Sequence, residues 1–305
     1  MDYINDLVSV VIPTHNRSEL VVRAIRSAFS QTYKKIEIIV VSDGYDQKTE
    51  DAMKQYNSSI FKFISYDKPL GGNHARNMGI KASKGEWVAF LDDDDEWLNN
   101  KISLQIELSK IDKDIGLICT AFNSIDDETG RVSFFCPTAK KDASIQILKT
   151  NCIGSTTTAM VKHILLDDVG LFDEKLFARQ DYDLWIRLCQ ITKVGIVEIP
   201  CVNYHNLATN NQISWDYKKY QHAAEYMNNK YFELFEKKLS KKEIKTILCN
   251  EKLSISRKAF KANNRSMCRK FAIESLKIRF TIKGILHFFA SFFSYKLVQR
   301  FYEKN

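Results

Sequence analysis

Residues 86–97 read EWVAFLDDDDEW, an apolar run that ends in four consecutive aspartates. The apolar part, residues 86–91, predicts a strand buried on both faces, and side chains that directly follow such a strand point into the ligand crevice of an α/β fold. Four adjacent carboxylates repel one another unless a cation or solvent relieves the repulsion. Carboxylate oxygens suit Mg2+ or Mn2+, which share ligands with substrate phosphates. We therefore predict a metal site here, with a solvated acidic loop as the alternative.

Strand and helix patterns alternate on both sides of this run. Continuous apolar, β-branched runs predict further buried strands at residues 7–13, 36–42, 61–66 and 116–121. Asn16 followed by Glu19 predicts a capping box that opens a helix ending near Gln31. Helical patterns also fill residues 47–56, 74–83 and 97–110. This alternation predicts a parallel sheet covered by helices, with the site at the carboxyl ends of the strands.

The later sequence is mixed and then helical. A Glu-Thr-Gly turn within residues 122–136 predicts a hairpin. We expect a helix at residues 181–191, a strand at 193–199, and helices from about residue 213 to the end.

Composition limits the class of protein. A chain of 305 residues that is 45% hydrophobic can bury a substantial core, which excludes wholesale disorder. Its seven cysteines include no C-x-x-C pair, which argues against a disulfide framework or zinc site and favours a reducing compartment. We see no signal-peptide pattern and no apolar run of spanning length, so we expect a cytoplasmic protein.

Charge is distributed unevenly along the chain. Residues 230–305 hold 19 basic and 6 acidic side chains, a net charge of +13, whereas the rest carries −5. Cations and aromatic rings alternate near the end: Lys277, Arg279, Lys283, Lys296 and Arg300 with Phe280, Phe288, Phe289, Phe292, Phe293, Tyr295, Phe301 and Tyr302. This pattern predicts a segment in the interface of an anionic membrane. A helix packed on the body, or a nucleic-acid-binding region, is the alternative.

The turn after the first strand reads PTHNR, residues 13–17. It lacks the G-x-G-x-x-G of dinucleotide-binding folds, and we find no P-loop sequence either. NAD and P-loop chemistry are therefore disfavoured.

Five segments, in order, resemble the signatures of family 2 glycosyltransferases with the GT-A fold. They are VSVVIPTHNR (8–17), IIVVSDG (38–44), LGGNHARNMGI (70–80), FLDDDDEW (90–97) and ARQDYDLWIRL (178–188). The resemblance implies an α/β GT-A fold, a mostly parallel sheet flanked by helices with a helical C-terminal extension. It also implies a catalytic domain at residues 1–212 (donor-binding half 1–121, acceptor-binding half 122–212) and a basic helical region at 213–305.

The resemblance assigns roles to the donor-binding residues. Pro13 and Thr14 would line the nucleotide pocket, and Asp43 would accept a hydrogen bond from uracil. The family often has two acids at that point, whereas this chain has Ser42 before Asp43. Arg76 would contact the ribose or a phosphate.

The resemblance also assigns the metal and the base. Asp92 and Asp93 would hold the ribose and support the metal, while Asp94 and His205 would coordinate it. Asp181 would be the catalytic base; capping of the following helix is its alternative role. Gln180 stands where the family commonly has a second acid.

The activity implied by the resemblance is that of an inverting, non-processive hexosyltransferase. It would use a UDP-sugar and Mn2+ or Mg2+, and its acceptor would be a polyprenyl-diphosphate-linked saccharide in O-antigen or capsule assembly. We expect a peripheral location at the inner face of the cell membrane and no nucleic-acid partner. A sugar-phosphate nucleotidyltransferase and a nucleic-acid-binding protein are the rival classes.

Overall fold

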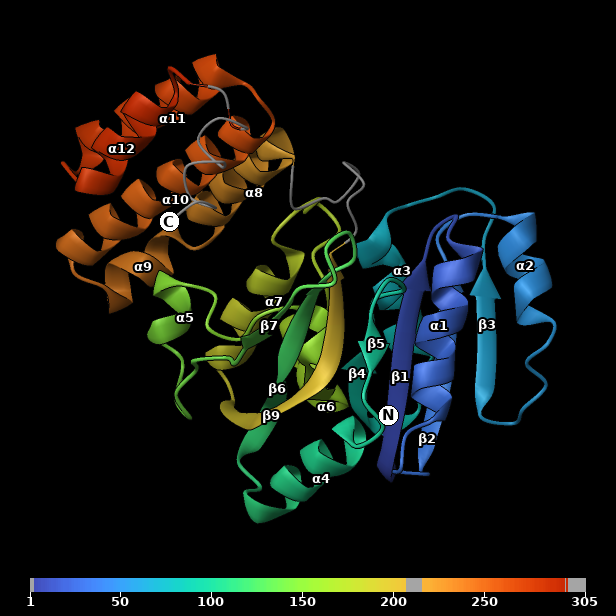
Figure 1. The fold of residues 1–305 in the computed structure, drawn as a ribbon. Coiled ribbons are helices and arrows are strands. Elements are labelled where there is room, and N and C mark those ends of the chain that lie inside the picture. The colour runs from blue at the N-terminus through green and yellow to red at the C-terminus, as the bar shows by residue number, and fades with distance from the viewer. Residues whose placement is uncertain (1–2, 207–215, 294, 296–305) are drawn as a thin grey trace. The chain divides into compact units, whose positions relative to one another are not determined.

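The computed structural model describes residues 3–206, 216–293 and 295 (Figure 1). The chain divides into two compact units. The first contains Met1–Ile147, Asn151–Lys175 and Gln180–Ala208, and the second contains Leu148–Thr150, Leu176–Arg179 and Thr209–Asn305. Lys296, Arg300, Phe301 and Tyr302 of the predicted membrane segment lie outside the described residues.

Four parallel strands form the first half of the sheet in the order β3-β2-β1-β4. Their bounds are β1 Ile4–Thr14, β2 Ile36–Ser42, β3 Phe61–Ser65 and β4 Gly85–Phe90. Thr14 pairs with Ser42 at the carboxyl ends of β1 and β2. The parallel direction therefore brings the residues that follow these strands to one edge of the sheet.

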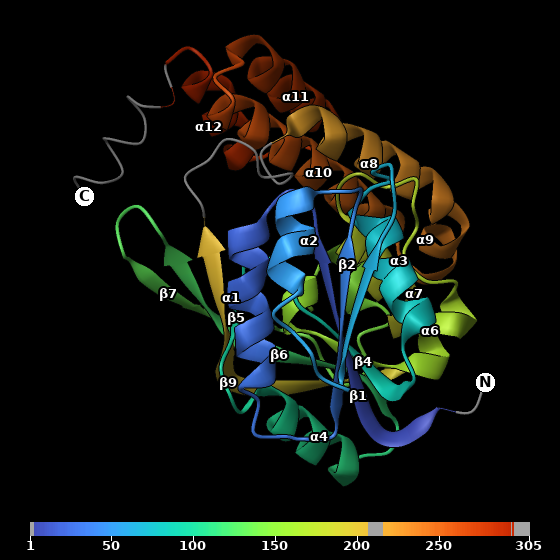
Figure 2. The ribbon, with the colours of Figure 1, turned by 90° about the vertical axis from the view of Figure 1, so that its right-hand side faces the viewer.

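Helices α1 Ser18–Phe29 and α3 Gly72–Ala82 cover opposite faces of these strands, and α2 Gln47–Met53 packs beside α1. Helix α4 Lys101–Ile111 packs on the second half of the sheet. Val21 and Ile25 of α1 pack with the residues of β1 and β2 that face one side, while Ala75 of α3 packs with Ile39 and Val41 on the other. Figure 2 shows α1 and α3 on opposite sides of the strands. At Gly79 of α3, a Cβ atom would lie 2.4 Å from Val11 Cγ1, so only glycine permits this close approach.

The second half of the sheet is mixed. Its strands are β5 Glu96–Trp97, β6 Ile115–Asp126, β7 Val132–Phe135, β8 Met160–Lys162 and β9 Lys193–Asn206. Strand β8 lies antiparallel between β4 and β6, and β9 runs parallel to β6. The accompanying helical elements are α5 Gln146–Lys149, η1 Thr156–Thr158, α6 His163–Val169 and α7 Gln180–Cys189.

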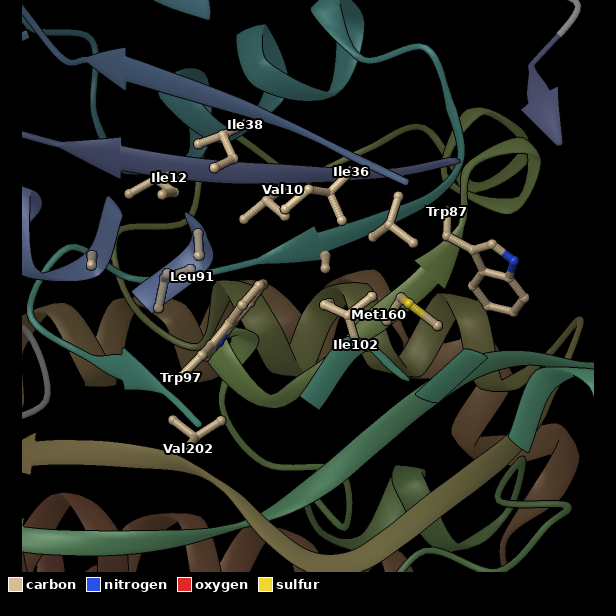
Figure 3. Close-up of a cluster of buried hydrophobic side chains, with 14 of the residues drawn as sticks. Val10, Ile12, Ile36, Ile38, Trp87, Leu91, Trp97, Ile102, Met160 and Val202 are labelled. Atoms are coloured by element: carbon tan, nitrogen blue, oxygen red, sulfur yellow. The ribbon is translucent and has the colours of Figure 1, made fainter. Parts of the chain in front are cut away.

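A buried apolar cluster joins the two halves of the sheet. Figure 3 shows its members reaching toward one another from β1, β2, β4 and β8, with Trp97 of β5 and Ile102 of α4. Trp97 Nε1 donates to the Thr157 carbonyl oxygen at 2.9 Å, which satisfies its buried polar atom.

The second unit contains α8 Tyr217–Lys230, α9 Phe232–Lys238, α10 Lys241–Lys261, α11 Arg265–Ile278 and α12 Ile282–Ala290, coloured from orange to red in Figure 1. Ala224, Ile255 and Phe271 form a core shared by α8, α10 and α11. Ser240 and Glu243 form a capping box at the start of α10. Among the described helices, none is long and apolar enough to cross a membrane.

The predicted fold class is confirmed, and several local predictions are wrong, among them the end of β9, which continues to Asn206 and does not stop at residue 199. Helix α1 begins at Ser18 without a side-chain cap, so Asn16 and Glu19 form no capping box; Asn16 instead adopts a left-handed φ of 53°. Trp97 lies in β5, because Glu96 and Trp97 pair with β9, and α4 begins only at Lys101.

Candidate functional site

Residues at the ends of β1 and β4 meet directly, because the two strands are neighbours in the sheet. Thr14 Oγ1 donates to Asp93 Oδ2 at 2.7 Å. Arg17, three residues beyond Thr14, places Nη1 3.0 Å from Asp93 Oδ1 and 3.0 Å from Asp94 Oδ2. Arg23 of α1 donates to the Asp94 carbonyl oxygen. The acidic segment is therefore held by cations from the β1–α1 turn and the helix that follows.

Asp92 is held from two other elements. Arg76 of α3 donates from Nη2 to Asp92 Oδ1 at 2.6 Å, and Thr156 of η1 donates to Oδ2 at 3.0 Å. Arg76 is only 8% exposed and lies over the Phe172 ring, 5.7 Å from its centroid. Its Nε is buried without a partner among the described residues, so the guanidinium retains an unused donor.

The acidic segment has an unusual electrostatic environment. Burial raises the pKa of Asp93 to about 6, although the Arg17 charge opposes the change. Burial and the Asp92 carboxylate raise the pKa of Asp94. Burial, followed by repulsion from Asp92 and Asp94, raises the pKa of Asp95 well above its usual value. An additional positive charge near these carboxylates would thus stabilise the folded acidic segment.

Asp43 lies in a pocket of hydrogen-bond donors at the end of β2. Its backbone N–H donates to the Thr14 carbonyl oxygen at 2.8 Å, which joins it to the end of β1. Its Oδ1 accepts from Tyr66 Oη at 2.7 Å and from Leu70 N at 2.7 Å, and its Oδ2 accepts from Gly71 N at 2.9 Å. Gly71 adopts a φ of +102°, which a residue with a side chain rarely takes.

Asp181 lies in the first turn of α7, with Oδ2 3.4 Å from Asn151 Nδ2. Tyr204 of β9 lies within electrostatic range of both Asp181 and the acidic segment. Burial raises the pKa of the Tyr204 hydroxyl, and the charges of Asp95, Asp92, Asp94 and Asp181 raise it further. The carboxylates of α7 and of the acidic segment therefore act on one buried hydroxyl. Asp183, by contrast, is fully buried and paired with Arg187, which gives it a structural role.

His205 meets the acidic segment through its backbone, since its N–H donates to Asp95 Oδ1 at 3.1 Å. Its ring Nδ1 lies 2.7 Å from Asp127 Oδ1, and Nε2 is buried with no partner among the described residues. A ring held in this way by a carboxylate can offer its other nitrogen to a metal ion, so the chemistry of the donors fits. In the described part of the chain, however, no three His, Cys, Asp or Glu side chains already converge as a metal site.

The structure brings most of the predicted site residues together. Those within hydrogen-bond contact of the acidic segment or of one another are Thr14, Asp43, Arg76, Asp92, Asp93, Asp94 and His205. Pro13 is buried in β1 beside them. The sequence alone assigned no role to Arg17, Thr156 or Tyr204, because their significance depends on contacts between distant elements. Arg17 belongs to the PTHNR turn, and that position was the only signal for it.

Solved structures identify the fold. The chain superposes on a mannosyltransferase from Pyrobaculum calidifontis, solved with GDP-Man and Mn2+, with a TM-score of 0.59, 16% identity, and coverage of 98% of this chain and 88% of that one. It matches the 1–349 fragment of S. aureus TarS, solved with UDP-GlcNAc, with a TM-score of 0.57, 18% identity, and coverage of 93% and 90%. The fold is therefore the GT-A fold, with the acidic segment at the carboxyl edge of the parallel strands.

Sequence comparison gives the family. Residues 9–170 match the model described as glycosyl transferase family 2, which is more than half of the 305 residues. The chain therefore belongs to glycosyl transferase family 2.

Several curated relatives carry glycosyltransferase names. An uncharacterized glycosyltransferase of Rickettsia typhi is 39% identical over 195 residues, 62% of this chain and 60% of that protein. The amylovoran biosynthesis glycosyltransferase AmsB of Erwinia amylovora is 32% identical over 215 residues, 65% and 69% of the two chains. The Escherichia coli UDP-Glc:alpha-D-GlcNAc-diphosphoundecaprenol beta-1,3-glucosyltransferase WfgD is 26% identical over 191 residues, 63% and 73%. The match to the Rickettsia typhi relative thus spans less than two thirds of that protein's length.

Proposed function

We propose that the protein transfers a hexose from a UDP-sugar, with inversion, to a hydroxyl of a lipid-diphosphate-linked saccharide in the assembly of a surface polysaccharide such as O-antigen or capsule. The acidic segment, residues 92–95, carries the proposal. Its side chains are gathered beside Arg17 and Arg76 at the edge of the sheet where α/β enzymes bind nucleotides. Residues 1–212 would carry catalysis, with the donor bound by 1–121 and the acceptor by 122–212.

The donor proposal rests on the residues around Asp43. Asp43 Oδ2 accepts from Gly71 N and keeps a lone pair that can accept the N–H of a uracil ring. Pro13 and Thr14 would line the same pocket, and Arg76 can reach a ribose or phosphate oxygen. The presence of UDP-GlcNAc in the TarS structure and of UDP-Glc in the name of WfgD supports a UDP-sugar.

A divalent ion, Mn2+ or Mg2+, would be held by Asp94 and His205, with Asp92 and Asp93 supporting them. When bound, it supplies positive charge that neutralises the departing diphosphate. The Asp94 carboxylate and the free His205 Nε2 are suitable donors, and the Mn2+ in the Pyrobaculum mannosyltransferase structure favours such an ion. Arg17 would supply part of the same charge to the diphosphate once Asp94 is engaged.

The remaining chemistry is a proton transfer. We assign the acceptor proton to the Asp181 carboxylate, which Asn151 orients from 3.4 Å. The deprotonated hydroxyl would attack the anomeric carbon from the face opposite the diphosphate, and this attack inverts the configuration there. Tyr204, whose hydroxyl lies within the field of Asp181 and the acidic segment, would help to shape the acceptor side of the site.

The lipid-linked acceptor would bring the protein to the inner face of the cell membrane. Three side chains at helical spacing, Ile282, Leu286 and Phe289, leave an apolar face on α12 that is 57–76% exposed. The opposite side of the helix packs on its own unit, since Gly284 touches Leu276. An exposed apolar face on a unit rich in cations fits the interface of an anionic bilayer. The diphosphoundecaprenol acceptor named for WfgD supports this location.

The experiment that tests the proposal is a donor screen. The purified protein is incubated with a panel of UDP-sugars and GDP-sugars, with MnCl2 or with EDTA, and release of the nucleoside diphosphate is measured. We expect UDP release from one or a few UDP-sugars, dependent on the metal. Release from GDP-sugars alone would refute the donor assignment, and equal release in EDTA would refute the metal assignment.

A further inference from the structure

A hollow of about 340 Å3 in the helical unit is lined by four side chains, all of them cationic. Lys241, Lys242 and Lys245 come from the first two turns of α10, and Arg279 directly follows α11. The site described above uses none of these residues. The membrane face of α12 does not include them either.

The hollow has no countercharge of its own. Glu243, the acid in the same helical turn, is engaged elsewhere: its Oε1 lies 2.6 Å from Lys149 Nζ, and its Oε2 accepts from Ser240 N. No ion pair joins any of the four cations to a carboxylate in the part of the chain that the structure describes. The four positive charges around the hollow repel one another, and a bound anion would lower their electrostatic energy.

The cations are arranged for an oxyanion with several oxygens. Arg279 Nη1 donates to Thr246 Oγ1 at 3.0 Å, which fixes the guanidinium beside α10. A guanidinium offers a planar pair of donors to a phosphate, and lysines add mobile positive charges. The amino-terminal turn of the 21-residue helix α10 adds a favourable dipole for an anion. A phosphate or diphosphate group matches this set better than a single carboxylate does.

Exposed apolar side chains follow Arg279, the last cation of the hollow, in the sequence. Phe280 follows Arg279 along the chain and is 78% exposed, and Ile282, the first residue of α12, is 76% exposed. A cationic hollow next to exposed apolar side chains complements both parts of a lipid phosphate, which has an anionic headgroup and apolar chains. We propose that Lys241, Lys242, Lys245 and Arg279 bind the phosphate group of a membrane lipid. This inference rests on the proposed membrane location and adds a site specific for phosphate to it.

The test compares two double variants of equal charge. Lys242→Gln with Lys245→Gln removes two cations of the hollow, while Lys219→Gln with Lys237→Gln removes two exposed cations of α8 and α9 outside it. Each protein is first checked for unchanged helicity and thermal unfolding. Binding is then measured by sedimentation with phosphatidylcholine vesicles that contain phosphatidic acid, with vesicles of equal surface charge made with phosphatidylglycerol, and in competition with inorganic pyrophosphate.

We expect the hollow variant to lose about tenfold or more in affinity for phosphatidic acid vesicles, and the control variant several-fold less. The wild type should prefer phosphatidic acid to phosphatidylglycerol at equal surface charge, because each phosphomonoester headgroup concentrates its charge on one phosphate and exposes more free oxygens. Equal losses in both variants would overturn the proposal in favour of a general surface field. Tight binding of pyrophosphate without any preference among vesicles would replace the lipid by a free phosphate ligand.

A third variant separates this inference from the proposed function. Leu286→Ser with Phe289→Ser removes apolar side chains of α12 and leaves the hollow intact. Loss of binding to every vesicle in this variant, with normal behaviour of the hollow variant, would preserve the membrane location and overturn the phosphate site. Vesicle binding requires no donor sugar, so a failure of the transferase proposal would leave these results unchanged.

Discussion

Replacing Arg17 with methionine removes the counter-cation of the acidic segment, and we expect a loss of stability that depends on pH. Arg17 Nη1 lies 3.0 Å from both Asp93 and Asp94, whose side chains are 8% and 21% exposed. Water cannot fully replace the guanidinium at carboxylates so poorly exposed. Even with Arg17 present, burial raises the pKa of Asp93 to about 6. The free energy gained by deprotonating this carboxyl at pH 7 is therefore small.

That small gain limits the cost of the substitution. At pH 7, one unit above the pKa of Asp93, deprotonation of this carboxyl stabilises the folded wild type by about 1.4 kcal/mol. If Asp93 stays protonated in the Arg17→Met variant, the folded variant lacks this amount of stability. Arg17 is itself 36% exposed, so solvent screens its pair with Asp94, and that pair adds less than about 1 kcal/mol. We expect the free energy of unfolding to fall by about 1–2 kcal/mol at pH 7, a shift in Tm of roughly 2–6 °C.

The sign of the pH dependence follows from the raised pKa. The stability linked to protonated Asp93 is fully present below its ordinary pKa of 3.8 and is lost as the pH rises through about 6. The Arg17→Met variant should therefore lose much less at pH 5 than at pH 7. Thermal unfolding followed by circular dichroism at both pH values measures this, with Arg26→Met as the control, since Arg26 is an exposed cation of α1, the helix that follows Arg17. Equal losses at the two pH values, or an equal loss in the control, would refute the reasoning.

Three further results are expected. Calorimetry with Mn2+ present should give tighter binding of UDP than of CDP, because Asp43 can accept the uracil N–H; equal affinities would remove Asp43 from the donor site. Asp181→Asn should leave UDP-sugar binding nearly unchanged and lower kcat by roughly 100-fold, whereas lost affinity with normal turnover would make Asp181 a binding or capping residue. Burial lowers the pKa of Lys101 from 10.5 to about 7, so the free energy of unfolding of the wild type should rise between pH 7 and 10. Lys101→Met should abolish that rise in urea titrations, and an unchanged slope would contradict the assignment.

The sequence was sufficient to predict the half of the sheet that contains β1 to β4. Continuous apolar runs predicted β1 to β4, and the aspartates after residue 91 marked the correct edge. These features are local: a buried parallel strand must be apolar throughout, and the residues that directly follow it must lie at the carboxyl edge of the sheet. The second half depended on distant pairing. Strand β8, three residues long, carries no pattern that would place it antiparallel between β4 and β6.

Motifs in the sequence supplied the candidate site residues, but not the contacts between them. The aspartates, Arg76 and Asp181 came from motifs, whereas the cation bridging Asp93 and Asp94 is Arg17, 76 and 77 residues away in sequence. Tyr204 was missed because β9 was expected to end at residue 199, while its pairing with β6 continues to Asn206. Such contacts are fixed by how separate elements pack, which no local pattern contains.

The central claim is that Asp94 holds the metal ion on which sugar transfer depends. The most direct test measures UDP release from the active UDP-sugar by wild type and Asp94→Ala, each with MnCl2 and with EDTA, alongside Mn2+ binding followed by electron paramagnetic resonance. We expect the variant to stay folded, bind Mn2+ weakly and lose activity, and we expect EDTA to reduce the activity of the wild type to the same level. Normal activity of the wild type in EDTA, or of Asp94→Ala with Mn2+, would contradict the claim.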